Sequence, residues 1–386
     1  MIVFAILVAS LALVAWLYLA LGRGSFWRLK SATCNAAGRT EFSGSVAAVV
    51  PARNEAELIG PVVTSLLNQS VAMTVFLVDD ESTDCTAELA VRAAEEAGKT
   101  DALIVVQSKP LPKEWTGKLW AMHQGIEQAR TRNPAWLLLT DADVVHDPDT
   151  VANLGSIASQ GNYDLVSFMV KLHCESFAEK LLIPAFVYFF FMLYPPAWIR
   201  DSRRSTAGAA GGCMLMGSKA LECAGGLSAI PGEVIDDCSL ARLLKQQGGR
   251  LWLGITEQSE SLRRYKTFAE IERMVSRTAF NQLKHSWLLL LCTIAAMTIT
   301  YLAPPLLSFT SSMAAMLMGI AAWAIMAVTY SSMVRYYRLN PAWALSLPLA
   351  ALFYMGATIH SAVKYWSGGG GEWKGRVQDV PNRRAT

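Results

Sequence analysis

Two aspartates separated by one residue, Asp141 and Asp143, directly follow the apolar run 137–140. On an extended chain such residues point to the same side and lie about 6.5–7 Å apart. Their carboxylates can therefore share one hard divalent cation, Mg²⁺ or Mn²⁺, which prefers oxygen ligands and keeps open positions for phosphate. A D-x-D pair is also common as turn carboxylates, here ahead of Pro148. The apolar run before it and two earlier acidic clusters favour the metal site.

Two acidic clusters earlier in the chain also follow apolar runs. Pro51, Arg53 and Glu55 follow the first run, and Asp80 and Asp84 follow the second. A carboxylate at the end of a strand can accept hydrogen bonds from a ribose hydroxyl or from the N–H group of a nucleobase. Either cluster alone could equally consist of helix-capping or solvated turn residues.

The fourth acidic feature is the pair Asp236 and Asp237, ahead of the helical run 240–246. One of these carboxylates could act as a general base that takes a proton from an acceptor hydroxyl. The neighbouring carboxylate would raise its pKa, whereas a helix N-terminus and a nearby metal would lower it. Helix-capping aspartates are the alternative interpretation of this pair.

The elements between these clusters must position them, and residues 45–285 alternate between strand-like and helix-like segments. Such alternation predicts an α/β domain whose mostly parallel, Rossmann-like sheet carries helices on both faces. Ligands bind beyond the carboxyl ends of the strands in sheets of this kind, where the acidic clusters lie. The expected strands are 46–50, 74–78, 102–106 and 136–139, and the expected helices are 55–67, 86–97 and 119–129.

The composition indicates a membrane protein. Hydrophobic residues make up 53% of the chain and charged residues only 17%, whereas a soluble domain carries about a quarter. The net charge of +3 gives no sign of a nucleic-acid partner. The seven cysteines show no C-x-x-C spacing, which argues against a disulfide framework or a zinc site and suits a reducing cytosol.

Residues 1–22 carry no charge and are long enough to cross a bilayer, so we expect a transmembrane anchor there. Basic residues follow this run, beginning with Arg23, and they predict that the domain at 45–285 lies in the cytoplasm. A C-terminal membrane region, 286–364, contains about three hydrophobic segments, and a basic tail, 365–386, follows it. The expected location is the cell membrane, with several spans.

The predicted membrane topology poses two problems. If the apolar segment 181–199 crossed the membrane, Asp143 and Asp237 would lie on opposite sides, so we expect an interfacial segment, with a buried core helix as the alternative. Four crossings in all would put the tail outside, whereas its basic residues favour the cytoplasm. A re-entrant segment around Pro348 would remove this conflict. The basic residues concerned are Lys364, Lys374, Arg376, Arg383 and Arg384.

Together, the motifs 49–55, 78–84, 141–143 and 236–237 resemble those of the family 2 glycosyltransferases, which have the GT-A fold. The resemblance covers about residues 45–285. The membrane flanks and the tail motif at 373–376 are most similar to the ceramide-glucosyltransferase-like branch, and within it to the hopanoid-biosynthesis-associated (hopene-associated) glycosyltransferases of bacteria.

The resemblance implies roles for the residues of the acidic clusters. Asp80 would contact the uracil or ribose of a nucleotide-sugar, with Pro51, Arg53 and Glu55 beside the nucleotide. Asp143 would be the main ligand of the divalent metal, assisted by Asp141, which also lies beside the donor.

The acceptor side departs from the family's pattern. Asp237 stands at the position of the catalytic base, preceded by Asp236 where the family usually has glutamate. Lys118 stands at the position of a Gly-Lys pair that in the family is common near the donor diphosphate, so the resemblance implies that place for it. A Gln/Arg-x-x-Arg-Trp motif that follows in the family is reduced here to Arg277.

The function that the resemblance implies is inverting transfer of a sugar from a UDP-sugar or similar nucleotide-sugar to a membrane lipid, such as a hopanoid. A membrane nucleotidyltransferase would also use paired carboxylates, but it would typically have a glycine-rich basic loop after the first strand, where this chain has Pro51 to Glu55. A polysaccharide synthase normally needs more spans and an intact Gln-x-x-Arg-Trp motif. Both remain alternatives.

Overall fold

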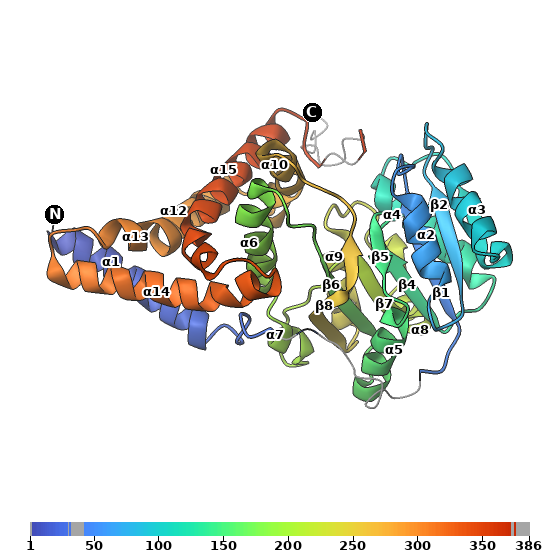
Figure 1. Cartoon of the computed structure of the whole chain (residues 1–386), viewed down its shortest axis with the longest axis horizontal. Coiled ribbons are helices and arrows are strands. Elements are labelled where there is room, and N and C mark those ends of the chain that lie inside the picture. Colours follow the sequence, from blue (N-terminus) through green and yellow to red (C-terminus); the bar gives the residue numbers. More distant parts are fainter. Residues whose placement is uncertain (1, 30, 32–41, 372–373, 376–386) are drawn as a thin grey trace, which may run out of the picture.

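The computed structural model describes residues 2–29, 31, 42–371 and 374–375. An α/β domain forms one end of the molecule, and long apolar helices extend from it to the other end, where the N-terminus lies (Figure 1). The tail motif at 373–376 is described only at Lys374 and Gly375, and Arg376, Arg383 and Arg384 lie outside the described residues.

One eight-stranded sheet, in the order β3-β2-β1-β4-β7-β6-β8-β5, forms the centre of the α/β domain. The first four strands are parallel, β6 is parallel to β8, and β7 and β5 are antiparallel to their neighbours. The strands are β1 (Val46–Ala52), β2 (Met73–Asp79), β3 (Leu103–Gln107), β4 (Trp136–Thr140), β5 (Val144–His146), β6 (Leu165–Lys171), β7 (Cys213–Gly217) and β8 (Leu251–Ser261).

Helices cover both faces of the sheet. Successive residues of β1 point to opposite faces, so Val49 packs in the core beneath α4 while Val50 packs in the core beneath α2. Gly125 of α4 allows close packing, because a Cβ there would lie 2.5 Å from Val49 Cγ1. The covering helices are α2 (Ile59–Leu67), α3 (Thr86–Glu96), α4 (Gly117–Arg130), α5 (Thr150–Gly161), α8 (Ser218–Cys223) and α9 (Asp236–Gln246).

The chain has five helical segments that are long and apolar enough to cross a membrane, within the residues described: Ile2–Leu21, Phe177–Arg200, Trp287–Leu307, Met313–Tyr336 and Pro341–Trp366. They contain α1 (Ile2–Leu21), α6 (Phe177–Leu193), α7 (Pro196–Arg200), α12 (Trp287–Met297), η4 (Thr298–Leu302), α13 (Ala303–Leu307), α14 (Met313–Tyr336), η5 (Pro341–Ser346) and α15 (Leu347–Trp366).

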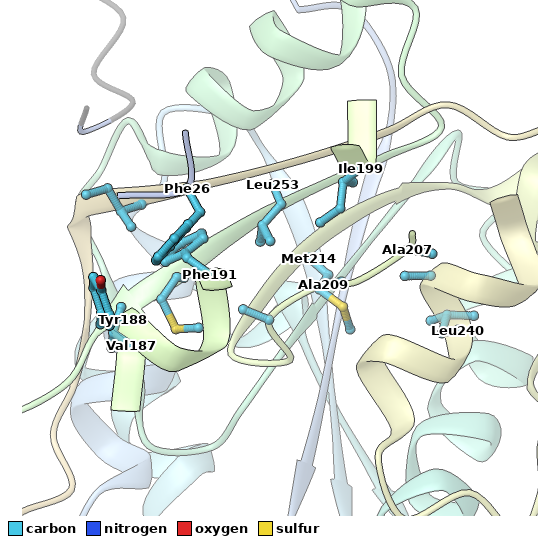
Figure 2. Close-up of a cluster of buried hydrophobic side chains, with 14 of the residues drawn as sticks. Phe26, Val187, Tyr188, Phe191, Ile199, Ala207, Ala209, Met214, Leu240 and Leu253 are labelled. Carbon is cyan, nitrogen blue, oxygen red and sulfur yellow. The ribbon is translucent and has the colours of Figure 1, made fainter. Parts of the chain in front are cut away.

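The α6 segment differs from the others because most of it is buried. The most apolar stretch of this segment is 61% buried, against 17% for the corresponding stretches of α1 and of the α12–α13 segment. Figure 2 shows Tyr188 and Phe191 of α6 in one cluster with Met214 of β7 and Leu253 of β8. Helix α6 also contacts α14 and α15. The interpretation of this segment as a buried core helix therefore agrees with its surroundings in the protein.

Helix α15 packs against α6 and α10. In its first half, Tyr354 Oη donates a hydrogen bond to Leu182 O of α6 at 2.8 Å. In its second half, His360 Nδ1 lies 2.6 Å from Glu272 Oε1, and Lys364 Nζ donates to Ser276 Oγ at 3.1 Å. Glu272 and Ser276 belong to α10 (Phe268–Ser276), which is followed by α11 (Ala279–Gln282). These contacts attach α15 to two helices that border the α/β domain.

Candidate active site

A cavity of about 540 Å³ opens at the carboxyl ends of β1 and β4. These strands lie where the chain reverses its direction across the sheet, since β2 and β3 follow on one side of β1 and β4 on the other. Ligands bind at such switch points. Of the residues that the sequence singles out, the cavity is lined by Pro51, Arg53, Glu55, Lys118, Asp141, Asp143 and Arg277.

The turn that carries Asp141 and Asp143 is fixed by a buried hydrogen-bond network. Thr140 Oγ1 donates to Gly212 O at 2.8 Å and lies 2.9 Å from His146 Nε2. The other ring nitrogen of His146 lies 2.8 Å from Ser259 Oγ. Burial lowers the pKa of His146 to about 4, so the ring is neutral at pH 7. The network attaches both ends of the turn to the sheet.

Asp143 and Glu55 converge on one arginine. Arg263, directly after β8, donates from Nε to Asp143 Oδ2 at 2.6 Å and from Nη2 to both oxygens of Glu55 at 2.6 and 2.9 Å. Lys374 Nζ contacts the same Glu55 at 2.7 Å. These contacts join the first acidic cluster, the D-x-D pair and the C-terminal tail in one site.

Lys118 connects the D-x-D pair to the fourth acidic cluster. At the start of α4, its Nζ lies 2.8 Å from Asp141 Oδ1 and 3.2 Å from Asp236 Oδ2. Asp236 and Asp237 begin α9 and do not belong to the cavity lining, so Lys118 lies between them and the D-x-D pair. In this structure, Lys118 therefore bridges two carboxylates.

Asp237 accepts hydrogen bonds from Gly211 N at 2.9 Å and from Cys238 N at 2.7 Å. Burial and the neighbouring Asp236 carboxylate raise the pKa of Asp237 to about 6, against the opposing effect of Lys118. Among the protein's own groups, burial and Asp236 therefore outweigh Lys118 and the two backbone hydrogen bonds. A carboxylate with such a pKa is suited to accept a proton near neutral pH.

The two aspartates of the D-x-D pair have opposite pKa shifts. Burial and the Asp141 charge raise the pKa of Asp143, although Arg263 opposes this effect. Burial also acts to raise the pKa of Asp141, but the Lys118 ammonium outweighs it and holds that pKa below its ordinary value. Two carboxylates that repel each other in this way would be stabilised by a cation placed between them.

Asp80 does not line the cavity. It is almost fully buried, with 1% of its surface exposed. Arg53 lies on the cavity side, with Nη1 3.7 Å from Asp80 Oδ2, and donates to the main-chain oxygen of the same residue. In this structure Asp80 therefore orients Arg53, and contact with a nucleotide stays a prediction.

Asp84 lies one residue before Cys85, the N-cap of α3. Its Oδ1 accepts from Thr86 N at 3.1 Å at the start of α3, and its Oδ2 accepts from Ala56 N at 3.2 Å. Asn54 reinforces the same junction, because its Oδ1 accepts from Thr83 N at 2.8 Å. Asp84 is therefore not the N-cap itself, and its contacts fasten the loops after β1 and β2 together.

The donor set fits a hard divalent cation. Asp141 and Asp143 offer two carboxylates, and the described residues contain no group of three or more His, Cys, Asp or Glu side chains that could hold a metal. Mg²⁺ commonly binds to one or two carboxylates plus water and substrate phosphate, so the pair is sufficient. To bind the cation, Asp143 would have to give up its hydrogen bond from Arg263.

Sequence reasoning missed several residues of the cleft, most of them in and around α10. The available signal was the arginine pair at 263–264, which follows a polar run in the sequence. Lys374 was noticed only as part of a tail motif, without a role in the site. The missed lining residues are Arg263, Arg264, Tyr265, Glu270, Arg273, Met274 and Lys374.

Comparison with known proteins supports the catalytic class. Residues 47–225 match the family described as Glycosyl transferase family 2. A 4,4'-diaponeurosporenoate glycosyltransferase of Staphylococcus aureus strain RF122 is 36% identical over 100 residues, which are 26% of this chain and 24% of that protein. Its counterpart from strain USA300 is 36% identical over 96 residues, which are 25% of this chain and 23% of that protein. The match thus spans about a quarter of these curated relatives.

Among solved structures, the mannosyltransferase PcManGT from Pyrobaculum calidifontis, in complex with GDP-Man and Mn²⁺, is similar in fold. The TM-score is 0.51 at 19% identity, over 94% of this chain and 98% of that one. The predicted fold class is therefore confirmed: a GT-A-like, mainly parallel sheet with helices, accompanied by long apolar helices.

Proposed function

We propose that this chain is a membrane-bound, inverting glycosyltransferase that moves a sugar from a nucleotide-sugar to a lipid acceptor. The observation that carries the proposal is the single cleft at the β1–β4 switch point, where Glu55, Asp141 and Asp143 meet and Lys118 extends the site to Asp236. The family 2 match over residues 47–225 supports the reaction class.

The donor would lie on the sheet side of the cleft. PcManGT was solved with GDP-Man and Mn²⁺, which supports a nucleotide-sugar and a divalent cation here. Asp143, assisted by Asp141, would hold Mg²⁺ or Mn²⁺, which when bound offsets the charge that grows on the leaving diphosphate. Arg263 and Lys374, which now contact Glu55, would together with Lys118 receive the diphosphate oxygens. UDP is the nucleotide that the motifs favour.

Proton transfer would fall to Asp237. Its raised pKa suits a base that takes the proton of an acceptor hydroxyl while the hydroxyl oxygen attacks the anomeric carbon. Direct attack with one base inverts the anomeric configuration. Asp236, held by Lys118 at 3.2 Å, keeps a negative charge beside the base and so helps to keep its pKa high.

A lipid acceptor is supported by the surroundings of the cleft. Helix α10 forms one wall of the cavity and packs against α15 and α6. The curated relatives act on 4,4'-diaponeurosporenoate, by their names. A hopanoid or another membrane lipid is the acceptor class that the sequence resemblance favours.

For the membrane we propose three crossings, made by α1, by α12–η4–α13 and by α14. Helix α15 would lie at the membrane surface, because its contacts with α6 and α10 hold it against the helices that border the α/β domain. The contact of Lys374 with Glu55 further supports a tail on the catalytic side. With the N-terminus outside the cell membrane, this count gives a cytoplasmic catalytic domain and a cytoplasmic tail, as the basic residues require.

The proposal is tested by incubating membranes that contain the full chain with UDP-glucose and, separately, GDP-mannose, each labelled in the sugar. We expect label in the organic phase, release of the nucleoside diphosphate, and loss of both on chelation of divalent cations. Label in a water-insoluble polymer would indicate a polysaccharide synthase instead. Label that moves together with a nucleoside monophosphate, with release of pyrophosphate, would indicate a nucleotidyltransferase.

A further inference from the structure

Three arginines in the cleft wall form no ion pair within 4 Å among the residues that the structure describes: Arg264 after β8, Arg273 on α10 and Arg277 directly after it. At longer range, the charge of Arg277 helps to lower the pKa of Asp141. All three are exposed into the cleft region. The remaining basic residues of the lining each lie against a carboxylate, namely Arg53, Lys118, Arg263 and Lys374. The unpaired positive charge is therefore concentrated on the α10 side.

Packing places two of these arginines, Arg273 and Arg277, on the cleft side of α10. Glu270, Arg273, Met274 and Arg277 follow the spacing i, i+3, i+4, i+7 and so share the face of α10 that lines the cavity. The other face is buried at Ile271 and bonded to α15 through Glu272. Glu270 is itself fixed in a capping box with Thr267. The arginine face is thus held rigidly against the cleft.

A bound nucleotide-sugar with its divalent cation would not neutralise the charges of the three arginines. The diphosphate of a nucleotide-sugar carries about two negative charges, and a divalent cation at Asp143 carries two positive ones, so together they nearly cancel. Arg263, which contacts Asp143, and Lys374 both lie against Glu55. Guanidinium groups bind carboxylate and phosphate through paired hydrogen bonds, and a neutral hydroxyl cannot offer this geometry.

We propose that Arg273 and Arg277, with Arg264 beside them, form a binding site for an anionic group, a carboxylate or a phosphate, on the lipid acceptor. This rests on the proposed function, because it names the acceptor class of the same cleft. The apolar part of such a lipid has a path next to the site. Phe268, at the start of α10, is 42% exposed, and its ring centroid lies 6.4 Å from that of Phe177 and 5.9 Å from that of Phe353.

The test measures binding without turnover. The full chain, in micelles of an uncharged detergent with UDP and Mn²⁺ present, is titrated with radiolabelled dodecyl phosphate, dodecanoate and dodecanol. The variants are the double substitution Arg273→Gln/Arg277→Gln and, as a matched control, Arg335→Gln. Arg335 is also exposed and ends α14, outside the cavity lining. Affinity for UDP with Mn²⁺ is measured for every protein.

We expect at least one anion to bind about tenfold or more tightly than dodecanol, which corresponds to about 1.4 kcal/mol. The double variant should lose this preference and keep its affinity for UDP, and Arg335→Gln should change neither. The better of the two anions identifies carboxylate or phosphate.

Equal binding of all three probes would overturn the inference. So would a double variant that weakens UDP and leaves the anion preference unchanged, because the arginines would then serve the donor. Displacement of the anions by an equal concentration of phosphatidylglycerol would also overturn it, since the arginines would then contact general membrane headgroups. A chain that shows the anion preference but transfers no sugar would contradict the proposed function and leave this site standing.

Discussion

At the scale of single residues, the cleft is a set of ion pairs that substrates would have to rearrange. Arg263 occupies Asp143 and Glu55, and Lys118 occupies Asp141 and Asp236. Each basic residue neutralises carboxylates that would otherwise repel one another in a partly buried site. The same contacts mean that Arg263 competes with any cation that binds Asp143.

Replacing Arg263 by glutamine should therefore tighten the binding of Mn²⁺ alone and weaken the binding of UDP. A charge-assisted hydrogen bond is worth about 1.5–3 kcal/mol, so the gain in Mn²⁺ affinity should be roughly tenfold or more. Electron paramagnetic resonance of free Mn²⁺ measures it without turnover. Arg92→Gln, which breaks the exposed pair with Glu96, is the control. Unchanged or weaker Mn²⁺ binding would show that Arg263 does not compete for Asp143.

The raised pKa of Asp237 also predicts a pH-dependent effect on stability. The folded state holds the proton of Asp237 more tightly than the unfolded state, in which the pKa is near 3.8. Ionised Asp237 therefore costs stability, and the cost grows as the pH rises from about 4 to about 6.

Asp237→Asn should accordingly gain melting temperature relative to the wild type over that range, with a constant difference above it. Thermal denaturation in detergent at a series of pH values measures this, with exposed Asp101→Asn as the control. A difference that stays flat from pH 4 to pH 7 would contradict the raised pKa.

At the scale of elements, the parallel half of the sheet was predictable and the other half was not. The expected strands 46–50, 74–78, 102–106 and 136–139 agree with β1 to β4 within about two residues at each end. Buried parallel strands read as continuous apolar runs, which makes them visible in a sequence. The mixed half, β5 to β8, was not predicted, because its strands pair with neighbours far away in the chain.

The same limit applies to the site. The D-x-D pair and the Asp236–Asp237 pair are local patterns and could be found from spacing. Arg263 meets Glu55 across 208 positions of the chain, and Lys374 meets it from the C-terminal tail. No local pattern shows such pairs, so the basic half of the cleft was visible only in the fold.

Close packing of α4 on the sheet positions Lys118, and a substitution at Gly125 tests this packing. A Cβ at Gly125 would lie 2.5 Å from Val49 Cγ1 and 2.8 Å from Val78 Cγ2. Gly125→Ala should therefore destabilise the protein by about 1–3 kcal/mol, as overpacking does. Gly60→Ala in α2 is the matched control, since nothing lies within 4 Å of its added Cβ and alanine favours a helix. A melting temperature unchanged by Gly125→Ala would contradict the packing.

At the scale of the whole molecule, apolar helices separate the catalytic end from the N-terminal end (Figure 1). Trp16 of α1 donates to Thr300 O of η4 at 2.7 Å, and α1 also contacts α14. Tyr336, which ends α14, donates to Thr256 O of β8. The proposed three crossings are compatible with these contacts and would remove the topological conflict that the sequence presents.

This topology predicts that residue 369 and the catalytic domain react from the same side. A single cysteine is introduced at Gly369, which is exposed. In that chain Cys34 and the cysteines that are exposed among the described residues, Cys85, Cys223 and Cys292, are replaced by serine. A membrane-impermeant maleimide should label residue 369 in inverted vesicles and fail to do so in intact cells. A cysteine at Phe309, between α13 and α14, should behave in the opposite way. Labelling of the Gly369 position from outside would mean that α15 crosses the membrane.

The central claim is that the D-x-D pair and the Asp236–Asp237 pair form one glycosyl-transfer site, with Asp143 serving the donor and Asp237 the acceptor. The most direct test is the rate of sugar transfer to lipid by Asp237→Asn at saturating donor, alongside its affinity for UDP with Mn²⁺. We predict a rate about 10²–10⁴-fold lower, the usual worth of a general base, with donor affinity kept. Asp143→Asn should instead lose that affinity. A wild-type rate for Asp237→Asn would contradict the account.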